Sequence, residues 1–257
     1  MKITDNTILI TGGGSGIGRG LAEAFHALGN KVIIAGRRQH TLEEVTDANP
    51  GMASVSLDIT DPAAIKAFAS EVTELHPTLN VLINNAGISR LEDMKTKTAD
   101  TTRAEAMITT NLLGPIRLTT ALLPHLQKQS RATIINVTSG LGFVPLPIAP
   151  TYSATKAAMH SYTESLRVQF KDTPLEFLEI IPPYVQTELG GKAQTVDPRA
   201  MPLKDFIAET MQILKSQPEA RENCVERVKP LRFAEATGSF DKMLQMLGQM
   251  TIDPSHP

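Results

Sequence analysis

A tyrosine and a lysine stand four residues apart in this chain, at Tyr152 and Lys156. Side chains at this spacing share one face of a helix, so an ammonium would lie beside a phenol. The ammonium favours the phenolate and lowers a phenol pKa that is otherwise about 10. Of the three tyrosines, only Tyr152 has a lysine four residues later. The pair therefore predicts a general acid/base that moves a proton.

Two other polar residues belong with this pair. Ser139 ends an apolar run thirteen residues before Tyr152, where its hydroxyl could bind a carbonyl oxygen of a substrate. Asn111 falls inside a long helical pattern, where a polar side chain needs a partner. Each of them alone is better explained as a capping or surface group. Together, and in this order, the four residues predict a catalytic site.

A glycine turn follows the first apolar run of the chain, with glycines at Gly12, Gly16 and Gly18. Glycines let the backbone turn sharply and approach a pyrophosphate, which the N–H groups and dipole of a following helix then hold. The spacing is not the Gly-x-Gly-x-x-Gly of the standard dinucleotide fingerprint, and no lysine follows as in a phosphate loop. A plain turn is the alternative. Its place after a first strand favours a dinucleotide.

The end of the second apolar run distinguishes between the two nicotinamide dinucleotides. NAD sites usually carry an acid there for the ribose 2′-hydroxyl, whereas this chain has Arg37 and Arg38. A guanidinium binds a 2′-phosphate that a carboxylate would repel. The sequence thus predicts NADP rather than NAD, unless both arginines are simply solvated. Asp58 and Ile59, after the third run, are expected beside the adenine.

The elements that must position these residues alternate along the chain. Six short apolar runs without polar alternation predict strands covered on both faces, at 7–11, 31–35, 53–57, 81–84, 133–137 and 175–181. Helical patterns separate or follow them at 16–28, 42–48, 62–75, 103–127, 151–170 and 202–215, and a Met-rich one at 240–250. We therefore predict an α/β fold, a Rossmann-type doubly wound parallel sheet of six to seven strands. One domain, 1–257, is the better count.

Composition excludes several other classes of function. The 257 residues carry 25 Lys and Arg against 27 Asp and Glu, a net charge of −2 with no basic stripe, which argues against nucleic acid as a partner. A lone Cys224 and six scattered histidines predict no metal site. No apolar run approaches the roughly 18–20 residues of a membrane helix, and the start of the chain has no signal-peptide layout. We expect a cytoplasmic protein without a membrane partner.

In these motifs, residues from about 5 to 190 resemble the short-chain dehydrogenases/reductases of about 250 residues. It carries Thr11-Gly-x-x-x-Gly-x-Gly18, Asn84-Asn85-Ala86-Gly87 and Tyr152-Ser-Ala-Thr-Lys156, besides Ser139 and Asn111. The resemblance implies that Tyr152 is the acid/base and that Lys156 lowers its pKa and binds the nicotinamide ribose. Ser139 would polarise the carbonyl, and Asn111 would hold a water in a proton relay. The implied cofactor contacts are Gly12, Gly14, Ser15, Gly16, Ile17, Gly18, Arg37, Arg38, Asp58, Ile59, Asn85, Ala86, Gly87, Tyr152, Lys156, Pro182, Val185 and Thr187.

The chain departs from the family pattern in two places. After the sixth predicted strand the family usually has Pro-Gly, whereas here Pro183 and Tyr184 follow Pro182, so one backbone N–H is lost. The usual glycine-rich closing segment is missing, which puts a seventh strand in doubt. The 180–185 and 226–229 stretches are instead similar to a bacterial branch named after an oxidoreductase of the D-alanine/lipoteichoic-acid operon.

The segment after Ser139 is apolar and contains three prolines. If it passes over the reacting carbon, the substrate would bind to Ser139 and Tyr152 against an apolar wall. This wall would be formed by Leu141, Phe143, Ile148 and Tyr184. Packing on helices or a second subunit is the alternative. Residues 188–215 could form a lid hinged at Gly190-Gly191, and 188–257 would combine this lid with an atypical C-terminal extension. A small apolar ketone or aldehyde fits such a pocket better than a phosphorylated sugar.

We therefore predict an NADP(H)-dependent oxidoreductase that acts on a carbonyl or alcohol carbon. A non-catalytic NADP(H) sensor is the alternative, although such proteins typically lose the tyrosine or the lysine, and a sugar-nucleotide epimerase would have a longer chain and a different glycine turn. By the same resemblance, a homodimer or homotetramer would associate through about 103–127 and 151–170. The Met/Leu stripe at 240–250 is expected to be core or subunit interface.

Overall fold

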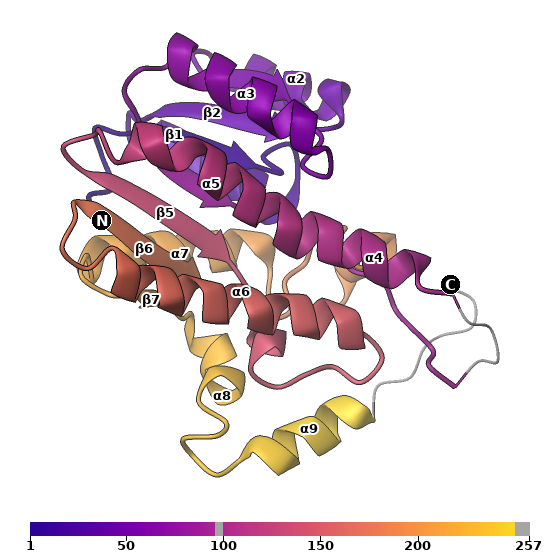
Figure 1. Cartoon of the computed structure of the whole chain (residues 1–257). Coiled ribbons are helices and arrows are strands. Elements are labelled where there is room, and N and C mark those ends of the chain that lie inside the picture. Colours follow the sequence, from indigo (N-terminus) through magenta and orange to yellow (C-terminus); the bar gives the residue numbers. More distant parts are fainter. Residues whose placement is uncertain (96–99, 250–257) are drawn as a thin grey trace.

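A single seven-stranded sheet forms the centre of the protein (Figure 1). The computed structural model describes residues 1–95 and 100–249. All strands are parallel, in the order β3-β2-β1-β4-β5-β6-β7. Their bounds are β1 Thr7–Thr11, β2 Lys31–Gly36, β3 Ala53–Ser56, β4 Leu79–Asn84, β5 Ala132–Val137, β6 Leu175–Ile180 and β7 Glu222–Asn223. This confirms the predicted doubly wound fold.

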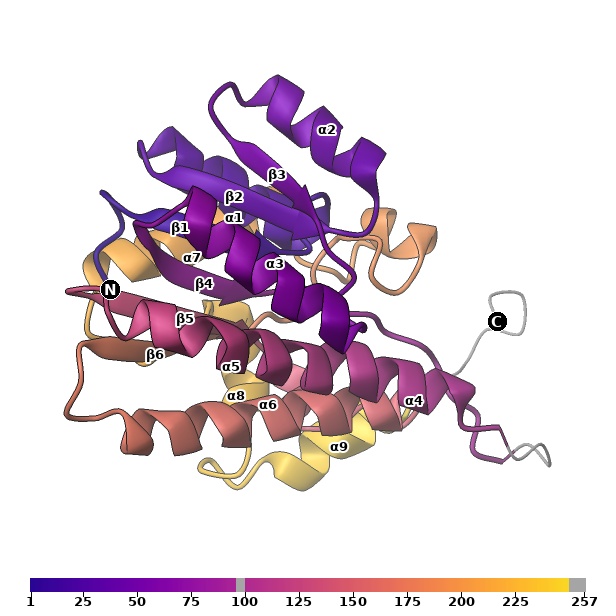
Figure 2. The same cartoon turned by 45° about the horizontal axis from the view of Figure 1, so that its top comes forward.

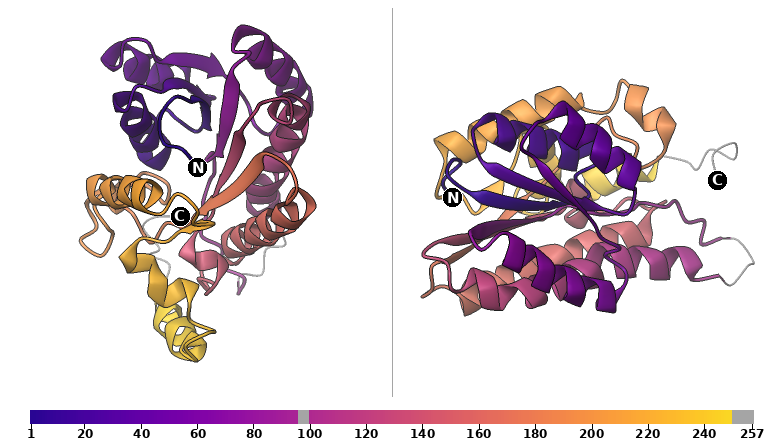
Figure 3. Two further views of the ribbon diagram at one scale, coloured as in Figure 1. Left: turned by 90° about the vertical axis from the view of Figure 1, so that its left-hand side faces the viewer. Right: turned by 90° about the horizontal axis from the view of Figure 1, so that it is seen from above.

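Helices cover both faces of the sheet (Figure 3). On one face, side chains such as Phe25, Val45 and Phe206 pack α1 (Gly16–Ala27), α2 (Gln39–Ala48) and α7 (Leu203–Ser216) onto the strands. On the other, towards the viewer in Figure 2, lie α3 (Pro62–Leu75), α5 (Gly114–Leu126) and α6 (Pro150–Gln169). Buried strands such as β1 and β5 are apolar without alternation because both of their faces are covered.

The predicted helix at 103–127 is interrupted. The chain forms α4 (Thr102–Ile108), a short π-helix η1 (Thr109–Leu113), and then α5. The backbone dihedrals are helical at both ends of η1, at residues 108, 109, 113 and 114, so hydrophobic periodicity alone gives no sign of the change in hydrogen-bond register. Such π-turns within helices are frequent at functional sites.

The chain beyond β6 differs most from the sequence prediction. The doubted seventh strand exists, although β7 has only two residues, and η4 (Glu226–Val228) and α8 (Lys229–Arg232) follow it. The fully buried Phe206 makes α7 part of the core, which confines any lid to 188–202 around η3 (Lys192–Val196). The Met-rich α9 (Phe240–Gly248) follows α8 and lies away from the sheet (Figure 1). None of its residues is buried, so the described part of this helix does not belong to the hydrophobic core. Met250 lies outside the described residues. Among the described helices, none has the length and hydropathy needed to cross a bilayer.

Candidate active site

The turns that carry Gly12, Asn85 and Ser139 leave the carboxyl ends of β1, β4 and β5, at the edge to which the strand arrowheads of Figure 1 point. In an open parallel sheet, ligands bind outside this edge where the strand order reverses. Here the order reverses between β1 and β4, so the turns after these two strands flank the crevice. The fold thus brings the predicted cofactor and catalytic residues to one edge.

The glycine turn after β1 requires its glycines for two separate reasons. Gly12 has a φ of +68°, in the left-handed region that side chains rarely adopt. A Cβ on Gly18 would lie 2.3 Å from the Gly12 carbonyl oxygen and 2.4 Å from Nδ2 of Asn85. Asn85 in turn donates this amide to the Thr11 carbonyl at 2.9 Å, and Thr11 Oγ1 accepts the Asn85 and Ala86 backbone N–H groups. The turns after β1 and β4 are therefore locked together.

The start of α1 has the features that a pyrophosphate site needs. The helix begins at Gly16, and the side chain of its N-cap residue, Ser15, makes no capping hydrogen bond. Backbone N–H groups at such an end, with the helix dipole, attract phosphate. Arg38 Nη2 donates to Ser15 Oγ at 3.0 Å, so this cation reaches across to the glycine turn, and Arg37 is exposed beside it. These residues fit an NADP-type dinucleotide.

The two residues expected near adenine are already engaged with protein atoms. Asp58 Oδ1 accepts hydrogen bonds from the backbone N–H and hydroxyl of Thr60, which hold the pKa of the Asp58 carboxyl below its ordinary value. The Ile59 side chain is buried against Gly114. The backbone of this pair, rather than the Ile59 side chain, is left to line an adenine site.

Tyr152 and Ser139 meet at the carboxyl end of β5, and both side chains are buried, with 7% of each residue exposed. Burial raises the pKa of Tyr152 to about 12, and a hydrogen bond with Ser139 opposes the shift. The sequence predicted the opposite direction. The difference arises because desolvation of the phenolate outweighs the single polar partner.

Lys156 lies one turn after Tyr152 on α6, as the spacing predicted. Its Nζ is 5.6 Å from the centre of the Tyr152 ring and donates to the Val137 carbonyl at 2.8 Å. Burial lowers the pKa of Lys156 to about 8, and attraction by the carboxylate of Glu179 opposes the shift. The lysine is therefore an ammonium for most of its time at neutral pH and holds the end of β5.

Asn111 sits in the π-helix η1 and is 2% exposed. Its Oδ1 accepts the Ile88 N–H and its Nδ2 donates to the Ile88 carbonyl, both at 2.8 Å, with Thr155 Oγ1 at 3.3 Å from Nδ2. The side chain thus ties the chain after β4 to α6. These contacts are the reason for a polar residue inside the helix.

One positioning residue has no signal in the sequence. The carboxylate of Glu92 accepts the Thr151 N–H at 3.0 Å and the Thr151 hydroxyl at 2.9 Å. It therefore caps the first turn of α6, directly before Tyr152. The two residues lie 59 positions apart, and no local pattern connects them.

The four candidates for an apolar substrate wall occupy different surroundings. Leu141 packs beside Tyr152, where Ile88, Leu91, Leu146, Met107 and Ala149 also gather. Phe143 instead lies against His160, with 4.7 Å between the two ring centroids. The guanidinium carbon of Arg232 lies 4.5 Å from the centroid of the Phe143 ring. Ile148 is half-buried, and Tyr184 is 42% exposed with its hydroxyl donated to Asp197. Only Leu141 lies in the cluster around Tyr152.

The chain after β6 crosses towards the glycine turn. The Pro182 carbonyl accepts the Gly140 N–H at 3.0 Å, and Val185 is buried in the core. Thr187 reaches the turn, because a Cβ on Gly16 would contact its side chain at 3.4 Å. Gln194 Nε2 binds Thr187 Oγ1 at 3.2 Å, so η3 is fastened to the same segment.

The structure also gathers titratable residues that sequence spacing does not connect. His160 and Glu164 of α6, Glu179 of β6 and Glu222 of β7 each place one ligand-type atom within 4.8 Å of one another. Arg232 holds Glu222 with two hydrogen bonds of 2.7 Å, and Glu164 pairs with Arg167. Because two of the three carboxylates already pair with arginines and Glu179 binds His160, we describe the group as an ion-pair cluster.

Comparison with known proteins agrees with this geometry. The family model described as short chain dehydrogenase matches residues 6–197. The oxidoreductase DltE of Bacillus subtilis (strain 168) is 38% identical over 250 residues, 96% of this chain and 98% of that protein. This coverage extends past residue 197, so the C-terminal part is shared with DltE.

Solved structures show the same fold. A serine dehydrogenase complexed with NADP+ is 28% identical with a TM-score of 0.73, covering 80% of this chain and 88% of that one. An NADPH-bound carbonyl reductase from chicken fatty liver is 30% identical with a TM-score of 0.72, covering 81% and 90%. The chain therefore belongs to the short-chain dehydrogenase/reductase family of oxidoreductases, in the branch of B. subtilis DltE.

Proposed function

We propose that this enzyme transfers hydride between NADP(H) and the carbonyl or alcohol carbon of a small apolar substrate, with Tyr152 as the general acid/base. The observation that carries the proposal is the buried meeting of Tyr152, Ser139 and Lys156 at the sheet edge that also carries the glycine turn. The nicotinamide supplies the hydride when bound. The protein supplies binding, orientation and the proton.

The protonation states favour an acid role for Tyr152 in the reductive direction. With a pKa of about 12, the phenol keeps its proton at neutral pH and can donate it to a carbonyl oxygen. Ser139 stands beside it as a second hydroxyl for that oxygen. Lys156, with a pKa of about 8, is mostly an ammonium and stabilises the phenolate left behind.

The surroundings of Tyr152 support an apolar substrate. Leu141, Ile88, Leu91 and Leu146 are the partly buried side chains packed around it, and none of them offers a polar group. A hydrophobic pocket discriminates weakly against an added hydroxyl but strongly disfavours a charge. We therefore propose an unphosphorylated ketone, aldehyde or alcohol.

NADP preference rests on Arg37 and Arg38, with no acid at the end of β2. The reach of Arg38 to Ser15 places a guanidinium over the glycine turn. Two relatives of the chain, the serine dehydrogenase and the chicken carbonyl reductase, bind NADP+ and NADPH. NAD is the less favoured cofactor.

Substitution Tyr152→Phe tests the proposal. We expect kcat for the best carbonyl of an apolar panel to fall about 100- to 10,000-fold, the usual contribution of general acid/base catalysis, because the ring remains and the proton is lost. The Kd for NADPH should stay within about twofold of the parent value. The matched control is Tyr162→Phe on the same helix, α6, which should leave kcat unchanged.

Two outcomes would contradict the proposal in different ways. Near-parent turnover in Tyr152→Phe would remove Tyr152 from its role. Tight NADPH binding by the parent without turnover of any carbonyl would favour the sensor instead.

We also propose that the chain forms a homodimer or homotetramer through α4, α5 and α6. Exposed apolar residues on or beside these helices, Ile108, Leu113 and Val168, support this surface. Light scattering measures the state, and a monomer at all concentrations would contradict it.

A further inference from the structure

Glu179 is a carboxylate buried completely at the carboxyl end of β6. Its Oε1 accepts the Thr138 hydroxyl at 2.6 Å, and its Oε2 lies 2.8 Å from Nδ1 of His160. A fully buried charge is costly unless it is hydrogen-bonded and compensated. Glu179 lies next to the proposed catalytic residues, so a role in their chemistry accounts for a charge buried at this position.

Three consecutive residues at the end of β5 connect Glu179 to the site. The Val137 carbonyl accepts the Lys156 ammonium, Thr138 donates its hydroxyl to Glu179, and Ser139 carries the hydroxyl that faces Tyr152. Lys156 and His160 are successive turns on one face of α6. Glu179 therefore binds Thr138 at the end of β5 and His160 on α6. These two elements carry the proposed catalytic groups.

We propose that Glu179 is a positioning residue that keeps Lys156 as an ammonium and fixes the Thr138–Ser139 strand end for proton transfer by Tyr152. The inference rests on the proposed function. The chemistry is electrostatic: a buried anion near an ammonium stabilises the charged form against desolvation. An ammonium rather than a neutral amine is what stabilises a developing phenolate.

The charges that face Lys156 and Glu179 come from several elements. The phenol of Tyr152 and the imidazole of His160 share α6 with Lys156, and Glu179 faces both from β6. Burial lowers the pKa of Lys156, and Glu179 raises it. A hydrogen bond that His160 donates to Glu179 raises the pKa of His160 above its ordinary value. Glu179 thus acts on two cations at once.

A second set of charges from the C-terminal part surrounds this pair. Burial alone would raise the pKa of Glu222, but Arg232 outweighs it and keeps the pKa low. Both Glu222 and Arg232 act on His160, and Glu164 with Arg167 completes the cluster. Burial next to Glu222 raises the pKa of Cys224 to about 12, so this thiol adds no charge at neutral pH.

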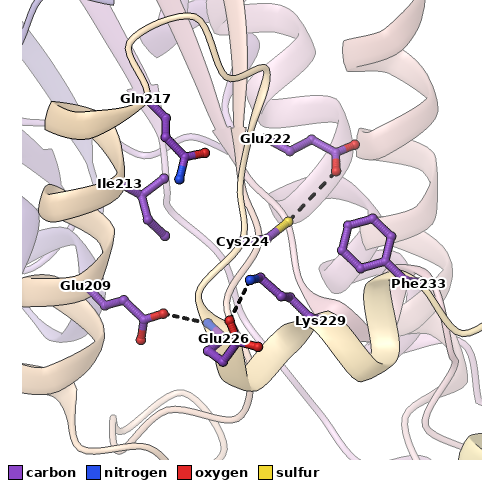
Figure 4. A pocket seen from close by; sticks show the side chains of 8 residues that line it. All are labelled: Glu209, Ile213, Gln217, Glu222, Cys224, Glu226, Lys229 and Phe233. Carbon is purple, nitrogen blue, oxygen red and sulfur yellow. Dashed lines mark hydrogen bonds and ion pairs between the residues drawn. The ribbon is translucent and has the colours of Figure 1, made fainter.

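The outer side of this cluster opens to a cavity of about 400 Å³ between α7, β7 and α8 (Figure 4). Glu222, Cys224, Lys229 and Phe233 are among its lining residues, whereas Glu179 is not. Water in the cavity therefore reaches Glu222 and not the Glu179 carboxylate. Because the Glu179 carboxylate is fully buried, solvent ions screen its attraction for Lys156 much less than they screen that of an exposed carboxylate.

The substitution Glu179→Gln separates charge from shape. The amide can still accept from Thr138 and contact His160, but the negative charge is gone. Isotope-labelled lysine allows the pKa of Lys156 to be measured by NMR from its Cε signal, assigned with Lys156→Met. We expect the pKa of Lys156 to fall by about one pH unit. Because the pKa of Lys156 is about 8 in the parent, a fall of one unit leaves about half of the lysine as ammonium at pH 7. We therefore expect kcat at pH 7 to fall about twofold and the alkaline limb of the pH profile to move about one unit lower.

Glu176→Gln is the matched control, since Glu176 lies on the same strand with 40% of its side chain exposed and binds the terminal amine and Arg131. It should leave both the Lys156 titration and kcat unchanged. A second variant, Thr138→Val, removes the hydroxyl and keeps the charge. It should lower kcat without shifting the titration.

The outcomes distinguish this inference from the proposed function. An unchanged pKa of Lys156 in folded Glu179→Gln overturns the positioning role, whatever the kinetics. A shifted pKa in a protein that turns over no carbonyl supports the electrostatic link and contradicts the proposed function. If Glu179→Gln fails to fold, Glu179→Asp replaces it, because the shorter acid moves the charge away from the cluster. Equal pKa values of Lys156 in Glu179→Asp and in the parent then overturn the positioning role.

Discussion

At the scale of single residues, the proposed catalytic pair shows that sequence spacing and local environment have separate effects. Four residues of separation place Tyr152 and Lys156 on one helix face, yet the pKa of Tyr152 is raised to about 12. The lysine is turned to the Val137 carbonyl and stays 5.6 Å from the ring centre. Burial, not the neighbouring cation, decides the direction. The buried phenol therefore keeps its proton at neutral pH.

The proposed preference for NADP also rests on single residues, and Arg38→Ala tests it. Loss of a charge-assisted hydrogen bond costs about 1.5–3 kcal/mol, so we expect NADPH affinity to fall roughly 10- to 100-fold with NADH affinity nearly unchanged. Fluorescence titration of both cofactors measures this. Arg131→Ala, at the opposite end of the sheet, is the control. Equal losses for NADPH and NADH would argue against 2′-phosphate recognition.

At the scale of elements, the turn between β1 and α1 is built by close backbone contact. Gly18 leaves no space for a side chain, because its Cβ would lie 2.3 Å from the Gly12 carbonyl. The same turn is fastened to β4 by Asn85. The proposed cofactor binding and the packing of α1 on the sheet therefore depend on the same atoms.

Gly18→Ala is expected to destabilise the protein by about 1–3 kcal/mol, as overpacking does, and to weaken NADPH binding by at least about tenfold. Urea unfolding and cofactor titration measure the two effects. Gly248→Ala is the matched control, because a Cβ there meets nothing within 4 Å. Unchanged stability and affinity in Gly18→Ala would mean that the turn relaxes freely.

At the scale of the whole molecule, charged groups hold residues 222–232 against α6 and the segment after Ser139. Arg232 binds Glu222 and stacks on Phe143, which lies in the segment after Ser139. His160 joins this group to Glu179. The C-terminal part, which the family model does not cover, thereby supports the proposed substrate segment.

The protonation of His160 in this cluster makes the free energy of unfolding depend on pH. The pKa of His160 is raised above 6.5 in the folded protein, mainly by its hydrogen bond with Glu179. Its contribution is therefore complete below pH 6.5 and is lost as the pH rises through the raised value. We expect the free energy of unfolding to fall over this interval, and His160→Gln to flatten the fall. Urea midpoints across the interval measure it, and His40→Gln, at an exposed position, should behave as the parent.

Sequence by itself determined the parallel sheet, five of the flanking helices, the glycine turn and the identity of the four catalytic candidates. These features are local: apolar runs, helical spacing and glycine positions are each read within about 20 residues. The seventh strand was in doubt because two residues carry no pattern. Likewise, η1 has the periodicity of the helices on either side of it.

Only the tertiary structure decided which charges meet. Glu92 reaches Thr151 across 59 positions, and Thr138 reaches Glu179 across 41. It also placed Phe143 on His160 and Arg232 rather than in the cluster around Tyr152, and made α7 core. Burial and long-range pairing set the pKa of Tyr152 and Lys156, and both depend on how distant segments pack. The residues that could do chemistry are therefore written in the sequence, and their protonation states arise in the fold.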